Sequence, residues 1–246
     1  EINKDGNCVP IPVTVDNTCP VPDTLGDSTT ENVNITGDNG EQTLQTILDN
    51  ANYSLDVQTD QKQFQVWNVT GGAKIDINAK FINEFAHNNQ VFGYYVNGDT
   101  SNFVPVFKTA NVVGYDSTPL SSAGPFTITV PTGATTLGFA IKTYDGDTFS
   151  NTMATQNSLN PNSKDQVVVY NPSSDNYVLA FEDINGGDND FNDLVVEVDL
   201  GCETTPPPVE NTCPAPDAVG DTTEETVNTV NNGEESLQTI LDNANY

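Results

Sequence analysis

The chain repeats part of itself, and this repeat fixes where a folded unit can lie. Residues 17–27 (NTCPVPDTLGD) return as residues 211–221 (NTCPAPDAVGD), and residues 44–53 (LQTILDNANY) return unchanged as residues 237–246. Self-similarity over such stretches is the signature of a repeat array. We therefore expect three parts, namely residues 1–16 as the tail of a preceding repeat and its linker, 17–210 as one complete repeat unit with its C-terminal linker, and 211–246 as the head of the next repeat.

The cysteines fall at the boundaries between these units. Cys8 and Cys19 have the same separation as Cys202 and Cys213, and each pair brackets a proline-rich stretch that favours polyproline II. We favour disulfides within each linker, which would close a small ring in each. The alternative is a Cys19–Cys202 disulfide that ties together the two ends of one unit. Either pairing requires an oxidising, extracellular environment.

The complete unit has the pattern of a β-rich domain. Short segments rich in β-branched and aromatic residues alternate with Asn, Gly, Pro and Asp turns, which predicts an all-β antiparallel sandwich resembling a jelly roll. Apolar residues at helical spacing in 40–51 predict one short helix near the start of each repeat unit. Residues 144–165 are expected to form a long polar loop. The predicted strands are 63–69, 73–81, 91–96, 103–108, 126–130, 137–143, 166–170, 177–181 and 194–199.

Residues 181–193 (FEDINGGDNDFND) concentrate carboxylates and amides between two predicted strands. The strands hold the ends of this acidic loop together, so its carboxylates cannot spread apart, and each pair in contact repels by about 4 kcal/mol near a protein surface. Oxygen donors without neighbouring His or Cys suit calcium better than other metals. The alternative is a solvated acidic turn. The expected calcium ligands are Glu182, Asp183, Asn185, Asp188, Asp190, Asn192 and Asp193.

Other candidate sites are weaker. Asp145 and Asp147 are a possible second metal site, although Asp-Gly-Asp is also a common turn. The single histidine, His87, has no nucleophile signature near it and is expected to be a surface or packing residue. No catalytic residues are predicted, and we expect no enzyme. Trp67 lies in an alternating segment and is expected in the core, whereas an exposed aromatic side chain would be able to stack on a sugar.

Charge and hydropathy exclude two classes of partner. Seven Lys and Arg against 35 Asp and Glu give a net charge of −28, which excludes nucleic-acid backbones and disfavours anionic membrane surfaces. No apolar run is long enough to insert into a membrane. The sequence begins at Glu1 without Met, so we expect a processed protein or a fragment of a longer one.

Three segments also carry a family resemblance. Residues 180–196 (AFEDINGGDNDFNDLVV), 130–141 (VPTGATTLGFAI) and 163–170 (SKDQVVVY) resemble the characteristic segments of the domain of unknown function 4114 family. The resemblance covers roughly residues 90–200. It implies a secreted β-sandwich of large bacterial surface and adhesin-like proteins, with calcium in the acidic loop. The chain departs from the family pattern at Gln166, where His is frequent, and at Ala180, where Gly is usual.

Together these features predict an extracellular, calcium-stabilised structural repeat of a cell-surface fibre, filament or adhesin. The expected partners are copies of the chain itself, in head-to-tail continuity. The alternative is a calcium-dependent module that binds carbohydrate or another surface polymer, carried by a secreted protein. An aromatic platform exposed beside the calcium would favour this alternative.

Overall fold

The computed structural model describes residues 19–24, 26, 30–36, 40–86, 88–109, 122–201, 239–241 and 244. The chain divides into two compact units, one of Asp16–Glu203 and the other of Glu1–Val15 with Thr204–Tyr246. In the second unit the structure describes only the helical residues 239–241 and Ala244. The predicted repeat boundaries stay a prediction.

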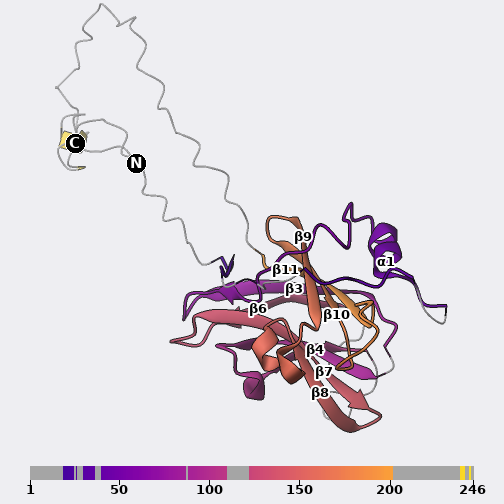
Figure 1. Ribbon diagram of the computed structural model, residues 1–246. Helices are drawn as coiled ribbons and strands as arrows, with labels where there is room; N and C mark the ends of the chain where they lie inside the picture. The colour runs from indigo at the N-terminus through magenta and orange to yellow at the C-terminus, as the bar shows by residue number, and fades with distance from the viewer. Residues whose placement is uncertain are drawn as a thin grey trace, which may run out of the picture. The chain divides into compact units, whose positions relative to one another are not determined.

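The described residues of the first unit fold into two antiparallel sheets packed face to face, which confirms the predicted all-β sandwich (Figure 1). The six-stranded sheet has the order β1–β2–β7–β4–β5, with β8 also paired to β7, and the five-stranded sheet has the order β6–β3–β11–β10–β9. The first sheet contains β1 (Val21–Pro22), β2 (Trp67–Asn68), β4 (Asn89–Val96), β5 (Val104–Lys108), β7 (Thr136–Asp145) and β8 (Thr148–Ala154). The second contains β3 (Lys74–Asn83), β6 (Ser122–Thr129), β9 (Val167–Ser173), β10 (Asn176–Phe181) and β11 (Leu194–Asp199).

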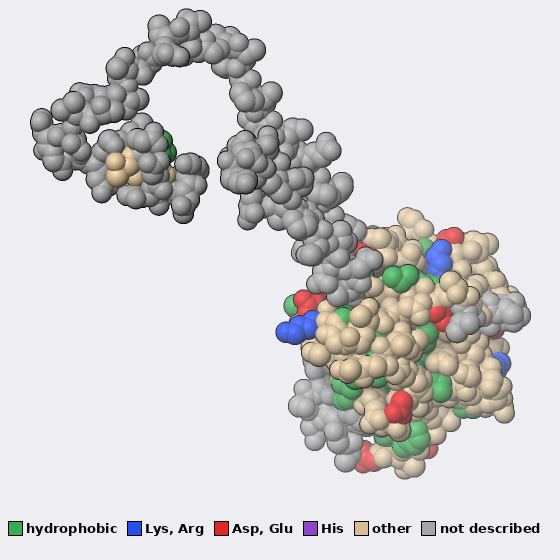
Figure 2. Space-filling view, turned by 90° about the vertical axis from the view of Figure 1, so that its left-hand side faces the viewer, with side chains coloured by type: hydrophobic (Ala, Val, Ile, Leu, Met, Phe, Trp, Pro, Cys, Tyr) green, Lys and Arg blue, Asp and Glu red, His purple; other side chains and the backbone are tan. Residues whose placement is uncertain are grey.

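The main hydrophobic core lies between the two sheets. Trp67 is fully buried at its centre, as predicted, and its ring packs edge-on against Phe64, Phe139 and Tyr177 at centroid distances of 5.0, 5.2 and 5.0 Å. Edge-to-face pairs at this spacing are favourable because of the ring quadrupole. On the face seen in Figure 2, the hydrophobic side chains of the sandwich lie in small, separate groups, as expected when most apolar area is inside.

A second core covers the opposite face of the five-stranded sheet. Strand residues alternate in direction, so Val178 and Ala180 of β10 point to this outer face while Leu179 and Phe181 enter the main core. The outer face is covered by helix α1 (Leu44–Asn50) and its flanking segments (Figure 1). The helix begins at the N-cap Thr43, whose hydroxyl accepts a hydrogen bond from Thr46 N, and buries three apolar side chains, Leu44, Ile47 and Leu48.

The structure departs from the predicted elements in three places. Residues 144–165 contain β8 and the short helices η2 (Asn157–Leu159) and η3 (Pro161–Ser163) instead of a continuous loop, and a further short helix, η1 (Thr100–Asn102), precedes β5. Strand β8 pairs only with β7, and its first residues are exposed, so it carries polar side chains without the alternation that identifies a half-buried strand. The predicted segment 63–69 forms a strand only at β2.

Several predicted residues lie outside the described part of the chain. Cys19 is exposed and forms no disulfide with any described residue, while its predicted partners Cys8, Cys202 and Cys213 are not described. The disulfide pairing therefore stays a prediction. His87 also lies outside the described residues. No described helix is long and apolar enough to cross a membrane.

Candidate metal site

The acidic loop connects β10 to β11, which are adjacent antiparallel strands. Phe181 and Leu194 are directly paired at the strand ends, so residues 182–193 must leave and return at the same edge of the sandwich. Gly186, Asn189 and Phe191 have positive φ angles of 84°, 60° and 51°, which curl the loop back on itself. The Phe191 ring, 1% exposed, packs into the outer core and anchors this end of the loop.

Three carboxylates of the loop converge. Glu182, Asp188 and Asp190 each offer an oxygen that lies within 4.8 Å of the other two, the only such acidic group among the described residues. Glu182 and Asp190 are buried, at 3% and 2% exposure, whereas Asp188 is exposed. Phe191 N donates to Glu182 Oε1 at 2.8 Å, and Asn192 N donates to Asp190 Oδ1 at 3.2 Å. The backbone thus holds one oxygen of each buried carboxylate.

The second oxygen of Glu182 has no such partner. Glu182 Oε2 is buried, and no described residue donates a hydrogen bond to it. A buried carboxylate oxygen without a donor is costly unless it is protonated or bound to a cation. Gly187 passes so close that a Cβ at this position would overlap Glu182 Oε2. The loop backbone therefore approaches this oxygen closely at Gly187, and a side chain at this position would force the Glu182 carboxylate to shift.

The electrostatics of the cluster favour positive charge. Burial raises the pKa of Glu182 to about 7, and the neighbouring carboxylates of Asp190, Asp188 and Asp183 add to this rise. Burial likewise raises the pKa of Asp190 to about 6, with further contributions from Asp188 and Glu41. Every charged neighbour that acts on these two groups is itself a carboxylate. A cation bound between them would reverse both shifts.

Two other predicted ligands lie beside the three convergent carboxylates. Asp183 accepts a hydrogen bond from Asn88 N at 2.9 Å through Oδ2, and its own N donates to Asp193 Oδ2 at 2.8 Å. Burial and the nearby Asp183 carboxylate raise the pKa of Asp193 well above its usual range. Both residues line the same hollow of about 460 Å³ as the convergent group, so five of the predicted ligands face one space.

The two predicted amide ligands do not line this hollow. Asn185 is exposed on the loop. Asn192 is buried, and its Nδ2 donates to Gln42 O at 3.0 Å, which ties the loop to the segment before α1. Their role as ligands stays a prediction.

Sequence reasoning missed the part of the site that comes from outside the acidic loop. Glu41 and Phe85 also line the hollow, and Asn34 N donates to Asn189 O at 2.7 Å. These residues lie far from the loop in sequence and outside any acidic run. The one available signal was the repeat itself, because Glu41 recurs as Glu234 at the equivalent position before the repeated helix sequence.

Comparison with known protein families also gives a match that includes the acidic loop. Residues 130–201 match a family model described as "Domain of unknown function (DUF4114)". The predicted family resemblance is confirmed over these residues. The matched stretch runs from the residue after β6 to just beyond the end of β11 and includes the whole acidic loop, but not Glu41 or Phe85.

Solved structures give weaker similarities. A high-affinity mannose-binding lectin of Ralstonia solanacearum aligns at 16% identity with a TM-score of 0.32, over 56% of this chain and 96% of that chain. The lectin CV2L of Chromobacterium violaceum, solved with alpha-methyl-fucoside, aligns at 15% identity with a TM-score of 0.30 and the same coverage. Neither likeness is strong enough to assign a ligand. The search of curated proteins found no match.

The second candidate metal site is an exposed hairpin turn. Asp145 and Asp147 flank Gly146, whose φ of 59° allows the tight connection between β7 and β8. Both side chains are exposed and belong to no three-carboxylate group within the described ranges. The geometry matches the turn that the sequence analysis named as the alternative, and metal binding here stays a prediction.

Proposed function

We propose that this chain is a non-enzymatic, extracellular repeat unit of a cell-surface fibre, filament or adhesin, stabilised by calcium in the acidic loop. The observation that carries the proposal is the buried, unpaired Oε2 of Glu182, which faces a hollow lined by carboxylates. Supporting it are the internal repeat and the match of the loop region to the DUF4114 domain. Copies of the same unit are the proposed partners.

Glu182, Asp188 and Asp190 would hold the ion. If all three were ionised at their observed spacing of 4.8 Å or less, each pair would repel by about 3 kcal/mol or more at an effective dielectric constant near 20. A divalent cation at the centre replaces this repulsion with attraction. Asp183, Asp193 and Glu41 line the same hollow and supply further oxygens, directly or through water, as calcium's six to eight ligands require.

The ion's role in this proposal is structural. Calcium supplies positive charge that neutralises the loop, and the protein's own residues fix the strand ends and the segment before α1 around it. The loop links β10 to the last strand of the sandwich, so holding it also holds β11 in register. Extracellular calcium modules often bind with dissociation constants of about 10⁻⁴ to 10⁻³ M, which suits a permanently calcium-rich exterior.

Calcium titration followed by thermal melting tests the proposal. We expect calcium to raise the melting temperature of the wild-type chain and chelator to lower it. In the double variant Asp188→Asn with Asp190→Asn, we expect the metal-free protein to melt no lower than wild type, because repulsion is relieved, while the response to calcium disappears. The matched control is Asp145→Asn with Asp147→Asn, which removes the same charge from the exposed hairpin turn and should keep the calcium response.

Two results would contradict the proposal. One is a melting temperature that does not change between chelator and excess calcium. The other is a calcium response that survives in the loop variant and is lost in the hairpin variant, which would move the site to Asp145 and Asp147.

A second candidate function is calcium-dependent binding of carbohydrate or another surface polymer. The observation that favours it is the half-buried ring of Phe85, which lines the acidic hollow, with Ile184 exposed beside it. An apolar surface next to a bound cation suits a sugar, whose hydroxyls can complete the coordination while its ring packs on the aromatic side chain. We expect any such binding to require calcium and to weaken in Phe85→Ala, measured by titration calorimetry with surface polysaccharides. Binding that persists in chelator would exclude this site.

A further inference from the structure

The outer face of the five-stranded sheet binds a helix whose sequence the chain carries twice. Leu44–Tyr53, which forms α1 and the turn after it, is identical to residues 237–246. The residues before it also correspond, since Gly40 and Glu41 recur as Gly233 and Glu234, and the N-cap Thr43 is replaced by Ser236, an equally good cap. Any surface that recognises the first copy is therefore able to recognise the second.

The two copies differ in burial. Ile47 and Leu48 of α1 are 1% and 0% exposed, whereas the equivalent Ile240 and Leu241 are 49% and 39% exposed. Both copies are helical at these positions. Ile240 and Leu241 of the second copy are thus exposed to solvent, whereas their counterparts in the first copy fill the outer core.

The outer face of the sheet recognises the helix through apolar packing. The outer core joins Leu44, Ile47 and Leu48 to side chains of three neighbouring strands and of the acidic loop. The residues that form this receiving face are Val168, Tyr170, Val178, Ala180 and Val195 of the sheet and Phe191 of the loop. All these side chains are buried in the structure. Removing the helix would therefore expose most of their apolar surface to water, which is unfavourable.

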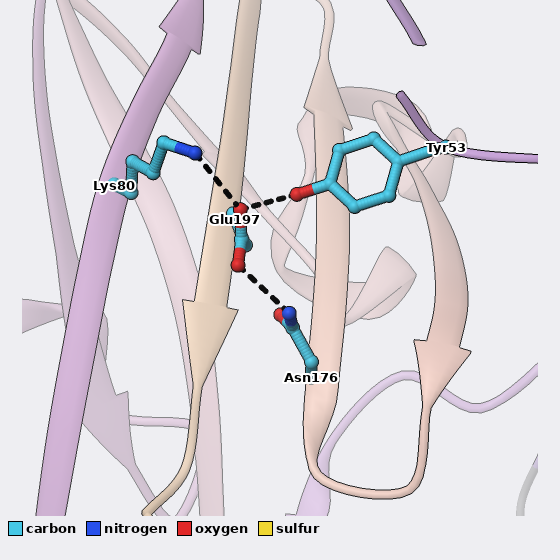
Figure 3. A network of polar contacts seen from close by, with 4 residues as sticks. All are labelled: Tyr53, Lys80, Asn176 and Glu197. Carbon is cyan, nitrogen blue, oxygen red and sulfur yellow. Dashed lines mark hydrogen bonds and ion pairs between the residues drawn. The ribbon is translucent and has the colours of Figure 1, made fainter. Parts of the chain in front are cut away.

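A polar contact fixes the register of the helix on this face. The Tyr53 hydroxyl donates to Glu197 of β11, whose carboxylate is also held by Asn176 Nδ2 at 2.7 Å and by Lys80 Nζ at 3.5 Å (Figure 3). Glu197 therefore stands preorganised between β3 and β10 to accept this hydroxyl. In the second copy, the residue at the same place in the sequence is Tyr246.

We propose that the outer face of the five-stranded sheet is an acceptor for Gly233–Tyr246 of a second copy of this chain, which can take the place of Gly40–Tyr53. The exchange is a form of domain swapping, in which identical elements of two chains change places at little cost. The tethered first copy has the higher effective concentration, so it occupies the face unless it is weakened or the chains are concentrated. This deepens the proposed role as a repeat unit, on which it rests, by naming the surface that joins copies.

The test uses the full chain and a fluorescently labelled peptide with the sequence of residues 233–246. Leu48→Ala weakens the tethered helix without changing the receiving face. We expect the peptide to bind this variant more tightly than it binds the wild-type chain by more than about tenfold, measured by fluorescence anisotropy. The matched control is the same peptide carrying Leu241→Ala, which should bind neither protein.

A double-mutant cycle identifies the receiving face. We expect Glu197→Gln in the Leu48→Ala chain to weaken binding of the wild-type peptide. The same change should have a smaller effect on a peptide carrying Tyr246→Phe, because that peptide has already lost the hydrogen bond. Sedimentation of the full chains gives the independent readout. The Leu48→Ala chain should self-associate as its concentration rises, and adding Leu241→Ala should abolish this.

The proposal is overturned if the peptide fails to bind the folded Leu48→Ala chain, or if the Leu241→Ala peptide binds equally well. Circular dichroism establishes whether the variant is folded, and if it is not, Ile47→Val replaces it as a milder change to the same helix and is judged by the same criteria. The calcium-dependent melting of each sample is recorded in parallel. A calcium response without peptide binding would refute the exchange alone, whereas binding without a calcium response would refute the calcium-dependent role alone.

Discussion

Replacing Glu182 by Gln would test whether the buried carboxylate is a source of instability in the metal-free protein. Burial and neighbouring carboxylates raise the pKa of Glu182 from 4.5 to about 7. The unfolded chain therefore ionises this group first as the pH rises. Between about pH 4.5 and 7 the folded state holds the extra proton, so its stability falls with rising pH and then stays lowered above that window.

The magnitude follows from the size of the shift. At about 1.4 kcal/mol per pH unit, the Glu182 shift corresponds to roughly 3 kcal/mol of stability, present below pH 4.5 and lost by pH 7 to 8. Glu182→Gln keeps the shape and the oxygen that accepts from Phe191 N, and it removes the charge. In chelator, the variant should therefore be more stable than wild type at about pH 8, and the difference should shrink towards about pH 5.

Denaturant unfolding followed by Trp67 fluorescence measures this difference, because Trp67 is the only tryptophan and is fully buried in the folded state. The comparison of the two proteins at each pH cancels the titration of groups far from position 182, while neighbouring carboxylates such as Asp193 add to the difference, because losing the Glu182 charge also relieves the repulsion on them. Calcium should reverse the order, stabilising wild type and leaving Glu182→Gln nearly unchanged. The reasoning is refuted if the difference in unfolding free energy between the two proteins is the same at both pH values in chelator. The exposed substitution Asp145→Asn serves as the control for the loss of one negative charge elsewhere in the chain.

Three further predictions concern the loop and the linkers. Gly187→Ala should weaken calcium binding and lower the melting temperature, because its Cβ would overlap Glu182 Oε2; an unchanged calcium affinity in calorimetry would contradict the loop geometry. Phe191→Ala should cost about 3–5 kcal/mol in denaturant unfolding, since the ring is 1% exposed and anchors the loop in the outer core, and a cost below about 1 kcal/mol would show that the ring does not hold it. Mass spectrometry of the unreduced chain after proteolysis should find disulfides within each linker, Cys8–Cys19 and Cys202–Cys213; a Cys19–Cys202 bond would favour the alternative instead.

Most strands of the two sheets could be predicted from the sequence because of the way apolar residues recur along them. Segment 194–199 has apolar residues at every second position and forms β11 over those very residues. Strand β8 was not predictable, because its sequence (TFSNTMA) is mostly polar and its exposed first half carries no alternation. What holds β8 in place is its hairpin pairing with β7, which the order of apolar and polar residues within β8 does not reveal. The local pattern thus identified the strands that carry several buried apolar residues and missed the strand that is mostly polar.

Only the part of the candidate site that lies within the acidic loop could be predicted from the sequence. Loop composition singled out Glu182, Asp188 and Asp190, which the structure brings together. The same reasoning gave equal weight to Asn185, which is exposed and does not line the hollow, because the loop's path depends on positive φ angles that the sequence does not state. Glu41 was missed since it reaches the loop only through the packing of α1 on the outer face.

The acidic loop contacts both the first and the last segments of the sandwich. These contacts explain how an ion in the loop would stabilise the unit. Asn192 Nδ2 donates to Gln42 O, and Asn34 N donates to Asn189 O, so the segment that enters α1 is hydrogen-bonded to the loop that precedes β11. Strand β11 pairs on its two sides with β3 and β10 and is the last strand of the unit. In the proposed role, an ion that fixes the loop therefore holds both the entering and the leaving segments of one repeat. Without the ion, carboxylate repulsion acts at the point where these segments meet, and this is also where the exchangeable helix begins.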